Sequence, residues 1–201
     1  AQKKYHMYSA GNIVKTGWYI DMDLIFDQFP SKIYPFDFET YFNSDARCLL
    51  TVTNCLTGKA EYIEEKKNKR RMMEAVRASS SLPFVSPMVY IDGKPMMDGG
   101  LTDSVPVQKA VRDGYKYNIV ICTRPKGYRK KEGRPGKSVK LARKVYKKYP
   151  MLVKALAQRN RRYNREMEWI EKMEAKGRVF VIRPSLPTVK RTEKNIVRLE
   201  H

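Results

Sequence analysis

Residues 88–100 constrain the fold more than any other part of the chain. Two apolar runs, 88–91 and 95–97, lie on either side of an Asp92-Gly93 pair. Asp-Gly between apolar runs is typical of a tight hairpin turn, because both central positions of such a turn need a positive φ. The sequence therefore predicts an antiparallel strand pair, with Asp98 at the end of the second strand.

Two glycines, Gly99 and Gly100, follow Asp98 directly. Because glycine has no side chain, another backbone segment or a substrate can approach closely at this turn. The tripeptide also has a purely structural interpretation, since aspartate and glycine both favour turns for local reasons. These three residues alone leave both interpretations open.

A serine-rich segment precedes the predicted hairpin, and a second acidic turn follows the two glycines. The first reads Ala78-Ser79-Ser80-Ser81-x-Pro83 and the second Asp103-x-x-Pro106. This arrangement closely resembles the acid-bearing region of patatin-like phospholipases, which are serine acyl hydrolases with a Ser–Asp dyad and no histidine. The similarity extends from about residue 15 to about residue 184. It is closest to the bacterial subgroup that has a basic insertion after the acid.

The resemblance implies an α/β fold with three layers, α/β/α, and a mainly parallel sheet. It implies hydrolysis of carboxylic esters, with lipid acyl chains as the substrate class and no cofactor. In such a dyad the serine attacks the ester carbonyl and the carboxylate takes its proton as general base. Asp98 matches the family's base by motif position. Gly99 and Gly100 match the glycines that let the active-site backbone pack closely.

The family's glycine-rich oxyanion loop and its G-x-S-x-G nucleophile motif have no counterpart in residues 1–201. Ser9-Ala10-Gly11 does not satisfy the motif, because position 7 is methionine and no buried strand precedes the serine. Residues 79–81 follow a helix, where serine usually bonds to backbone groups. The resemblance therefore implies a C-terminal portion of such an enzyme, without the nucleophilic serine and inactive alone.

Hydrophobic periodicity also predicts an α/β fold, because strands alternate with helices. Strand patterns are centred on residues 48–53, 117–123 and 179–182, and helical patterns on 72–79, 107–113, 138–149 and 150–176. The apolar run 117–123 is typical of a parallel strand covered on both faces. In the helix at 138–149, Leu141, Val145 and Tyr149 form an apolar stripe. In the helix at 72–79, we expect Met72, Met73 and Val76 to face inward.

The length of 201 residues predicts one domain over residues 1–198, with a basic helical insertion at about 124–177. Residues 199–201, Leu-Glu-His, resemble the start of an expression tag.

Three cysteines without a C-x-x-C spacing indicate reduced thiols in the cytoplasm, with Cys48 and Cys122 as small buried residues. Two histidines and no His/Cys cluster argue against a metal site. No apolar run approaches the ~20 residues that span a bilayer.

A formal net charge of +20 predicts attraction to polyanions, either nucleic acid or an anionic membrane. Between residues 124 and 148 lie twelve Lys or Arg and one acid, Glu132. The candidate residues for contact with an anionic surface are Arg129, Lys130, Lys131 and Arg134. A cytoplasmic hydrolase with peripheral membrane contact fits this segment. Two alternatives stay open: a non-enzymatic module that binds membrane or nucleic acid, although no specific nucleic-acid motif supports it, and a solvated basic face.

Overall fold

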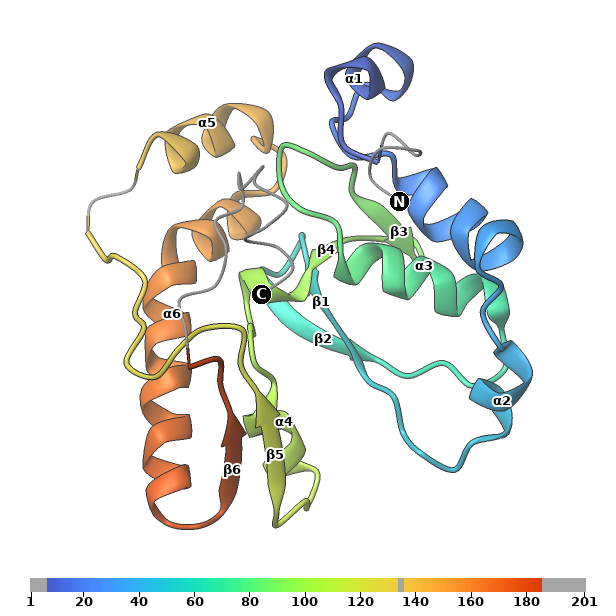
Figure 1. Cartoon of the computed structure of the whole chain (residues 1–201). Coiled ribbons are helices and arrows are strands. Elements are labelled where there is room, and N and C mark those ends of the chain that lie inside the picture. Colours follow the sequence, from blue (N-terminus) through green and yellow to red (C-terminus); the bar gives the residue numbers. More distant parts are fainter. Residues whose placement is uncertain (1–6, 134–135, 186–201) are drawn as a thin grey trace. The chain divides into compact units, whose positions relative to one another are not determined.

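A computed structural model of the chain describes residues 7–133 and 136–185 (Figure 1). The described residues fall into two compact units. The first comprises residues 7–104 and 136–159, and the second comprises residues 105–133 and 160–185. Helix α6 (Pro150–Ala175) contributes its first turns to the first unit and its remainder to the second. The single domain over residues 1–198 stays a prediction.

The first unit contains a four-stranded antiparallel sheet. Its strands lie in the order β2 (Lys59–Ile63), β1 (Leu50–Asn54), β4 (Lys94–Asp98) and β3 (Val89–Ile91). Strands β1 and β2 pair along their whole length, and β4 lies between β1 and β3. β3 pairs with β4 only as far as Met96, whereas β1 pairs with β4 to its last residue, Asp98.

The hairpin predicted from Asp92-Gly93 is confirmed. Asp92 has φ 50° and Gly93 has φ 75°, so both central positions of the turn adopt the left-handed conformation. Arg71 on helix α3 (Lys69–Ser79) binds the Asp92 carboxylate from outside, with one N–O distance of 2.8 Å. The turn is thus fixed by its own backbone preference and by a contact from the neighbouring helix.

Helices cover both faces of this sheet. On one face, α3 packs through Ala75 and Ala78 against a cluster that includes Met96. On the other face, α5 (Lys137–Val145) and the first turns of α6 pack against a cluster that includes Met97. Adjacent residues of a strand point to opposite faces, which explains why Met96 and Met97 belong to different clusters. The first unit therefore has three layers, α/β/α.

The α/β class is confirmed, with one antiparallel and one parallel sheet. Parallel pairing joins β5 (Asn118–Ile121) to β6 (Val179–Ile182) in the second unit. The expected parallel pairing therefore holds for this smaller sheet, and the larger sheet is antiparallel. The difference has a topological reason. Short turns join β1 to β2 and β3 to β4, and a short turn can join only antiparallel strands.

The apolar stripe predicted for α5 is wrong. The buried residues at this helix are Val139, Ala142 and Tyr146, whereas Leu141 is 48% exposed and Val145 is 52% exposed. Ala142 and Tyr146 belong to the cluster that includes Met97, so α5 uses a small residue and an aromatic ring to approach the sheet. The larger aliphatic side chains therefore face away from the core.

A similar correction applies to α3. Its buried residues are Met72, Ala75 and Ala78, and the predicted inward residues Met73 and Val76 are only half-buried. The alanines have no bulk beyond Cβ, so the helix can lie close to the sheet. A prediction that ranks residues by hydrophobicity misses the helix face formed by Met72, Ala75 and Ala78.

The hydroxyl of Tyr146 fixes an unusual backbone conformation in the first unit. It accepts a hydrogen bond of 2.8 Å from the backbone N–H of Phe84, a non-glycine residue with φ 71°. Burial raises the pKa of Tyr146, as expected for a phenol removed from water. We expect Tyr146→Phe to lower the free energy of unfolding by about 1–3 kcal/mol, because the Phe84 N–H loses its partner.

Urea unfolding of the Tyr146→Phe variant and of the original chain measures this difference in the free energy of unfolding. Tyr149→Phe is the matched control, because among the described residues the Tyr149 hydroxyl contacts the Tyr90 hydroxyl, at 3.4 Å and in an exposed position. We expect the control to change the free energy of unfolding by less than about 0.5 kcal/mol. Equal losses in the two variants would contradict the role given to the Phe84 hydrogen bond.

The second unit has its core between the β5–β6 pair and the C-terminal part of α6. The core includes Val120, Tyr163 and Ile170, with Val107 from α4 (Val107–Arg112). Ile119 and Ile121 are 71% and 74% exposed, so the prediction that this strand is covered on both faces is wrong for the described residues. One face of the strand pair packs against α6 and the other is an exposed apolar surface.

The remaining elements precede or follow the sheet strands of the first unit. They are α1 (Ala10–Thr16), the wide helix η1 (Leu24–Ile33), α2 (Phe38–Asn43) and the short helix η2 (Gly99–Leu101). Within residues 7–133 and 136–185, none of the helices is long and apolar enough to cross a bilayer.

Candidate active site

Asp98 is the last residue of β4 and pairs with Val52 of β1. Its backbone is fixed on both sides. The N–H donates to the carbonyl oxygen of Ser81 at 2.9 Å, and the carbonyl accepts from the Thr53 hydroxyl at 2.9 Å. The carboxylate is therefore carried by a rigid strand end, in a half-buried position.

The side chain of Asp98 caps the short helix η2. Its Oδ1 accepts a hydrogen bond of 2.6 Å from the backbone N–H of Gly100. A carboxylate held at a strand end can act as general base if a hydroxyl group comes within hydrogen-bond distance of it. The same hydrogen bond is also sufficient for a structural turn, so geometry alone supports both interpretations.

Gly99 is buried against strand β1. A Cβ atom at this position would lie 2.6 Å from the carbonyl carbon of Thr51, well inside van der Waals contact. The close approach that the sequence indicated is therefore made by the protein's own backbone. Glycine is needed here for packing.

Gly100 accepts two side-chain hydrogen bonds at its carbonyl oxygen, each of 3.0 Å. One comes from Nε of Arg159 on α6 and the other from the hydroxyl of Ser104. A Cβ atom on Gly100 would lie 3.0 Å from Oδ1 of Asp98. The absence of a side chain at Gly100 thus leaves room for the Asp98 carboxylate.

Sequence reasoning missed the residues that support this turn from other parts of the chain. The hydroxyl of Tyr62 on β2 donates to the carboxylate of Asp103. The hydroxyls of Thr53 and Thr102 form a hydrogen bond of 2.8 Å. Each pair joins residues more than 40 positions apart, and no local pattern in the sequence indicates them.

Three of the serines considered as nucleophiles are bonded to nearby backbone. The Ser79 hydroxyl donates to the Thr51 carbonyl at 2.8 Å, and the fully buried Ser81 donates to the Pro87 carbonyl. Ser9 caps helix α1 by accepting the Asn12 N–H at 3.1 Å. These contacts agree with structural roles for the three residues. Ser80 is exposed at the end of α3.

Two of the predicted surface-binding cations are engaged within the second unit. Arg129 forms a bidentate ion pair with Glu171, with N–O distances of 2.5 and 3.2 Å. The hydrogen bond from Arg129 lowers the pKa of Glu171, and the same bond raises the pKa of Arg129. The Lys130 ammonium lies 4.0 Å from the centre of the Tyr163 ring. Lys131 is exposed, and Arg134 lies outside the described residues. The surface-binding role of these four residues stays a prediction.

The cysteines differ from the expectation. Cys55 is the fully buried one, and its burial raises the pKa of the thiol to about 12, which makes a thiolate negligible near neutral pH. Cys48 and Cys122, predicted to be buried, are only half-buried. In the described part of the chain, no group of three or more His, Cys, Asp or Glu side chains could hold a metal ion.

Comparison with known proteins divides the chain into two matched regions. Residues 13–111, which include β1 to β4 and Asp98, match the family model of patatin-like phospholipases. Residues 149–201 match a domain of unknown function (DUF6363). The chain is also similar to the uncharacterized protein YjjU of Escherichia coli (strain K12), with 30% identity over 127 residues. That alignment covers 59% of this chain and 33% of YjjU, so the chain matches about a third of the relative's length.

Proposed function

Since the chain belongs to the patatin-like phospholipase family through residues 13–111, we propose that it is part of a lipid acyl hydrolase with Asp98 as general base. The observation that carries this proposal is the position of Asp98. Its carboxylate lies within the matched region, at the end of an inner strand, and the missing side chain of Gly100 leaves it space.

The proposed reaction has two steps. A serine hydroxyl attacks the ester carbonyl and passes its proton to Asp98, and the tetrahedral intermediate then expels the alcohol, which takes that proton. Water attacks the resulting acyl-serine while Asp98 again accepts a proton. The acid product then leaves, and the serine regains its proton. Backbone N–H groups stabilise the negative oxygen in both intermediates.

We propose that the nucleophilic serine is not among residues 1–201. The backbone contacts of Ser9, Ser79 and Ser81 support this, because each hydroxyl already serves a local bond. The chain alone should then show no hydrolysis of p-nitrophenyl esters and no reaction with a fluorophosphonate probe. Mass spectrometry of the probe-treated chain is the measurement, and a modified serine anywhere in residues 1–201 would overturn this part of the proposal.

The full-length protein that contains this chain provides the test of the function itself. It should release fatty acid from phospholipid vesicles and react with the fluorophosphonate probe at one serine. Prior treatment with the probe should abolish the release of fatty acid. Release of fatty acid that continues after complete labelling would contradict a serine mechanism, and no release from any phospholipid or soluble ester would contradict the hydrolase function.

A further inference from the structure

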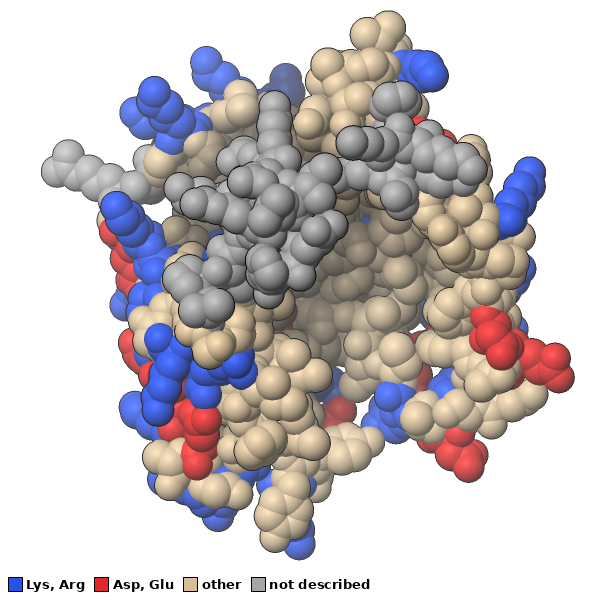
Figure 2. Space-filling model, in the orientation of Figure 1, with Lys and Arg blue, Asp and Glu red and all other residues tan. Residues whose placement is uncertain are grey.

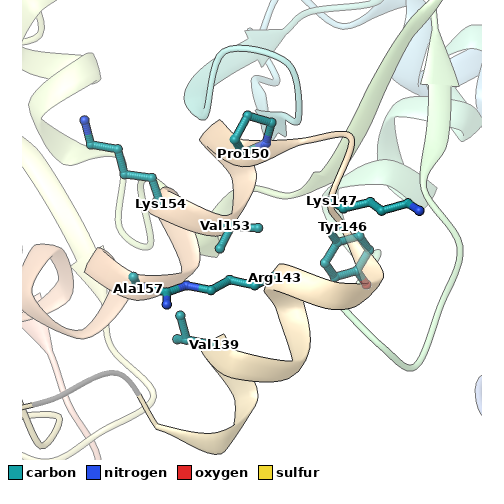
Figure 3. A pocket seen from close by; sticks show the side chains of 8 residues that line it. All are labelled: Val139, Arg143, Tyr146, Lys147, Pro150, Val153, Lys154 and Ala157. Carbon is teal, nitrogen blue, oxygen red and sulfur yellow. The ribbon is translucent and has the colours of Figure 1, made fainter.

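A shallow groove of about 450 Å³ lies between α5 and the start of α6, entirely within the first unit (Figure 3). Val139 on α5 and Val153 on α6 form its apolar floor, with Ala157 at one end. Val139 and Ala142 anchor α5 in the first unit through burial. The groove is thus a fixed feature on the outside of a packed helix pair.

Three cations surround this groove: Arg143, Lys147 and Lys154. All three are exposed, and none of them forms an ion pair with the other residues that the structure describes. In Figure 3, Arg143 lies along the floor, whereas Lys147 and Lys154 point away from the groove in different directions. A site for a single free phosphate would require the cations to converge on one point, and these cations do not. Their arrangement fits a partner that presents several anions over an area.

The outer face of α5 continues this basic surface and adds apolar side chains to it. Lys137, Lys140 and Lys144 are exposed there, beside the exposed Leu141 and Val145. The sequence contains no acidic residue between Glu132 and Glu166. Figure 2 shows Lys and Arg side chains projecting at the upper left, where α5 lies in Figure 1. Cations mixed with exposed aliphatic side chains are typical of helices that lie in a membrane interface.

We propose that the outer face of α5 and the adjoining groove form a docking surface for membranes that contain anionic phospholipids. The cations would contact headgroup phosphates, and Leu141 and Val145 would enter the apolar layer below them. Nucleic acid would also attract the cations, but it offers no apolar layer for two aliphatic side chains. This surface differs from Arg129 and Lys130, which are engaged by Glu171 and Tyr163.

The biological purpose of this docking surface rests on the proposed lipid hydrolase function. Its binding to membranes is nevertheless measured without any ester hydrolysis. Sedimentation of the full chain with phosphatidylglycerol vesicles, across a salt series, is the experiment. Binding should be strong at low salt and decline as salt rises, because exposed charges act over only about 8 Å at physiological salt. Neutral phosphatidylcholine vesicles should bind weakly throughout.

Two sets of charge-neutralising substitutions distinguish the effect of this surface on vesicle binding from the effect of the net charge of the chain. The variant Arg143→Gln, Lys147→Gln and Lys154→Gln should bind phosphatidylglycerol vesicles about a hundredfold more weakly, because each cation near such a surface contributes about fivefold. The matched control is Lys15→Gln, Lys32→Gln and Lys59→Gln, which removes the same charge at exposed positions outside α5 and α6. Equal weakening in the two variants would overturn the proposal in favour of a general charge effect.

A third variant tests the apolar contribution. Leu141→Gln with Val145→Gln should weaken vesicle binding several-fold and leave the binding of duplex DNA unchanged. All substituted side chains are exposed, so each variant should melt at the temperature of the original chain. Vesicle binding that is unaffected by this variant, or equal on neutral and anionic vesicles, would overturn membrane docking. Loss of fatty acid release by the full-length protein with vesicle binding intact would contradict only the proposed hydrolase.

Discussion

Replacing Asp98 with asparagine in the full-length protein is expected to lower kcat for ester hydrolysis by about 10²–10⁴-fold, the usual loss when a general base is removed. Folding should be nearly unchanged. The Gly100 N–H donates a hydrogen bond of 2.6 Å to the Asp98 carboxylate, and the side-chain oxygen of asparagine can accept the same bond. It cannot accept a proton from the nucleophile at neutral pH. The substitution thus tests the proposed chemical role of the carboxylate separately from its structural role.

Asp98→Ala removes both roles and serves as the comparison. We expect a similar loss in kcat, together with a decrease of about 1 kcal/mol in the free energy of unfolding, because the cap of η2 is lost. Asp92→Asn, in the exposed hairpin turn, should leave kcat unchanged. Near wild-type turnover in Asp98→Asn would exclude Asp98 from the mechanism. Unfolding of that variant to the same extent as Asp98→Ala would favour the structural interpretation of the turn.

The sequence predicted those features that depend on neighbouring residues. The positive φ at Asp92 and Gly93, the strand on each side and the position of Asp98 at a strand end all follow from residues within a few positions of one another. The strand at 179–182 and the helix that begins at Pro150 were placed correctly for the same reason. Local backbone preference and hydrophobic periodicity decide these features.

Features that depend on which surfaces meet could not be predicted. The sequence ranks Leu141 and Val145 above Ala142 as core residues, yet the structure buries Ala142 because a small residue lets α5 approach the sheet. The same limit applies to Ile119, since periodicity cannot show how many neighbours a strand has. The contacts of Arg159 with Gly100 and of Tyr62 with Asp103 join distant segments, and only the fold brings them together.

Gly99→Ala is expected to lower the free energy of unfolding by about 3 kcal/mol, at the upper end of the usual cost of overpacking a core. The added methyl group would lie 2.6 Å from the Thr51 carbonyl carbon, and the backbone atoms of the inner strand β1 cannot move aside as a flexible side chain can. Urea unfolding of residues 1–201 measures the effect without any need for enzymatic activity. Gly11→Ala is the control, because among the described residues its Cβ would meet the Ser9 hydroxyl alone, at 3.6 Å, and alanine favours the helix α1.

The substitutions Asp98→Asn and Gly99→Ala should therefore affect different quantities, kcat in the first and the free energy of unfolding in the second. Asp98→Asn should lower kcat with little change in stability, whereas Gly99→Ala should lower stability through its contact with Thr51. A loss below about 1 kcal/mol in Gly99→Ala would show that β1 yields to the methyl group. In that case, close packing would not explain the glycine, and an approach by substrate would become the better explanation. The expected larger loss would mean that close packing of η2 against β1 requires a glycine at this position.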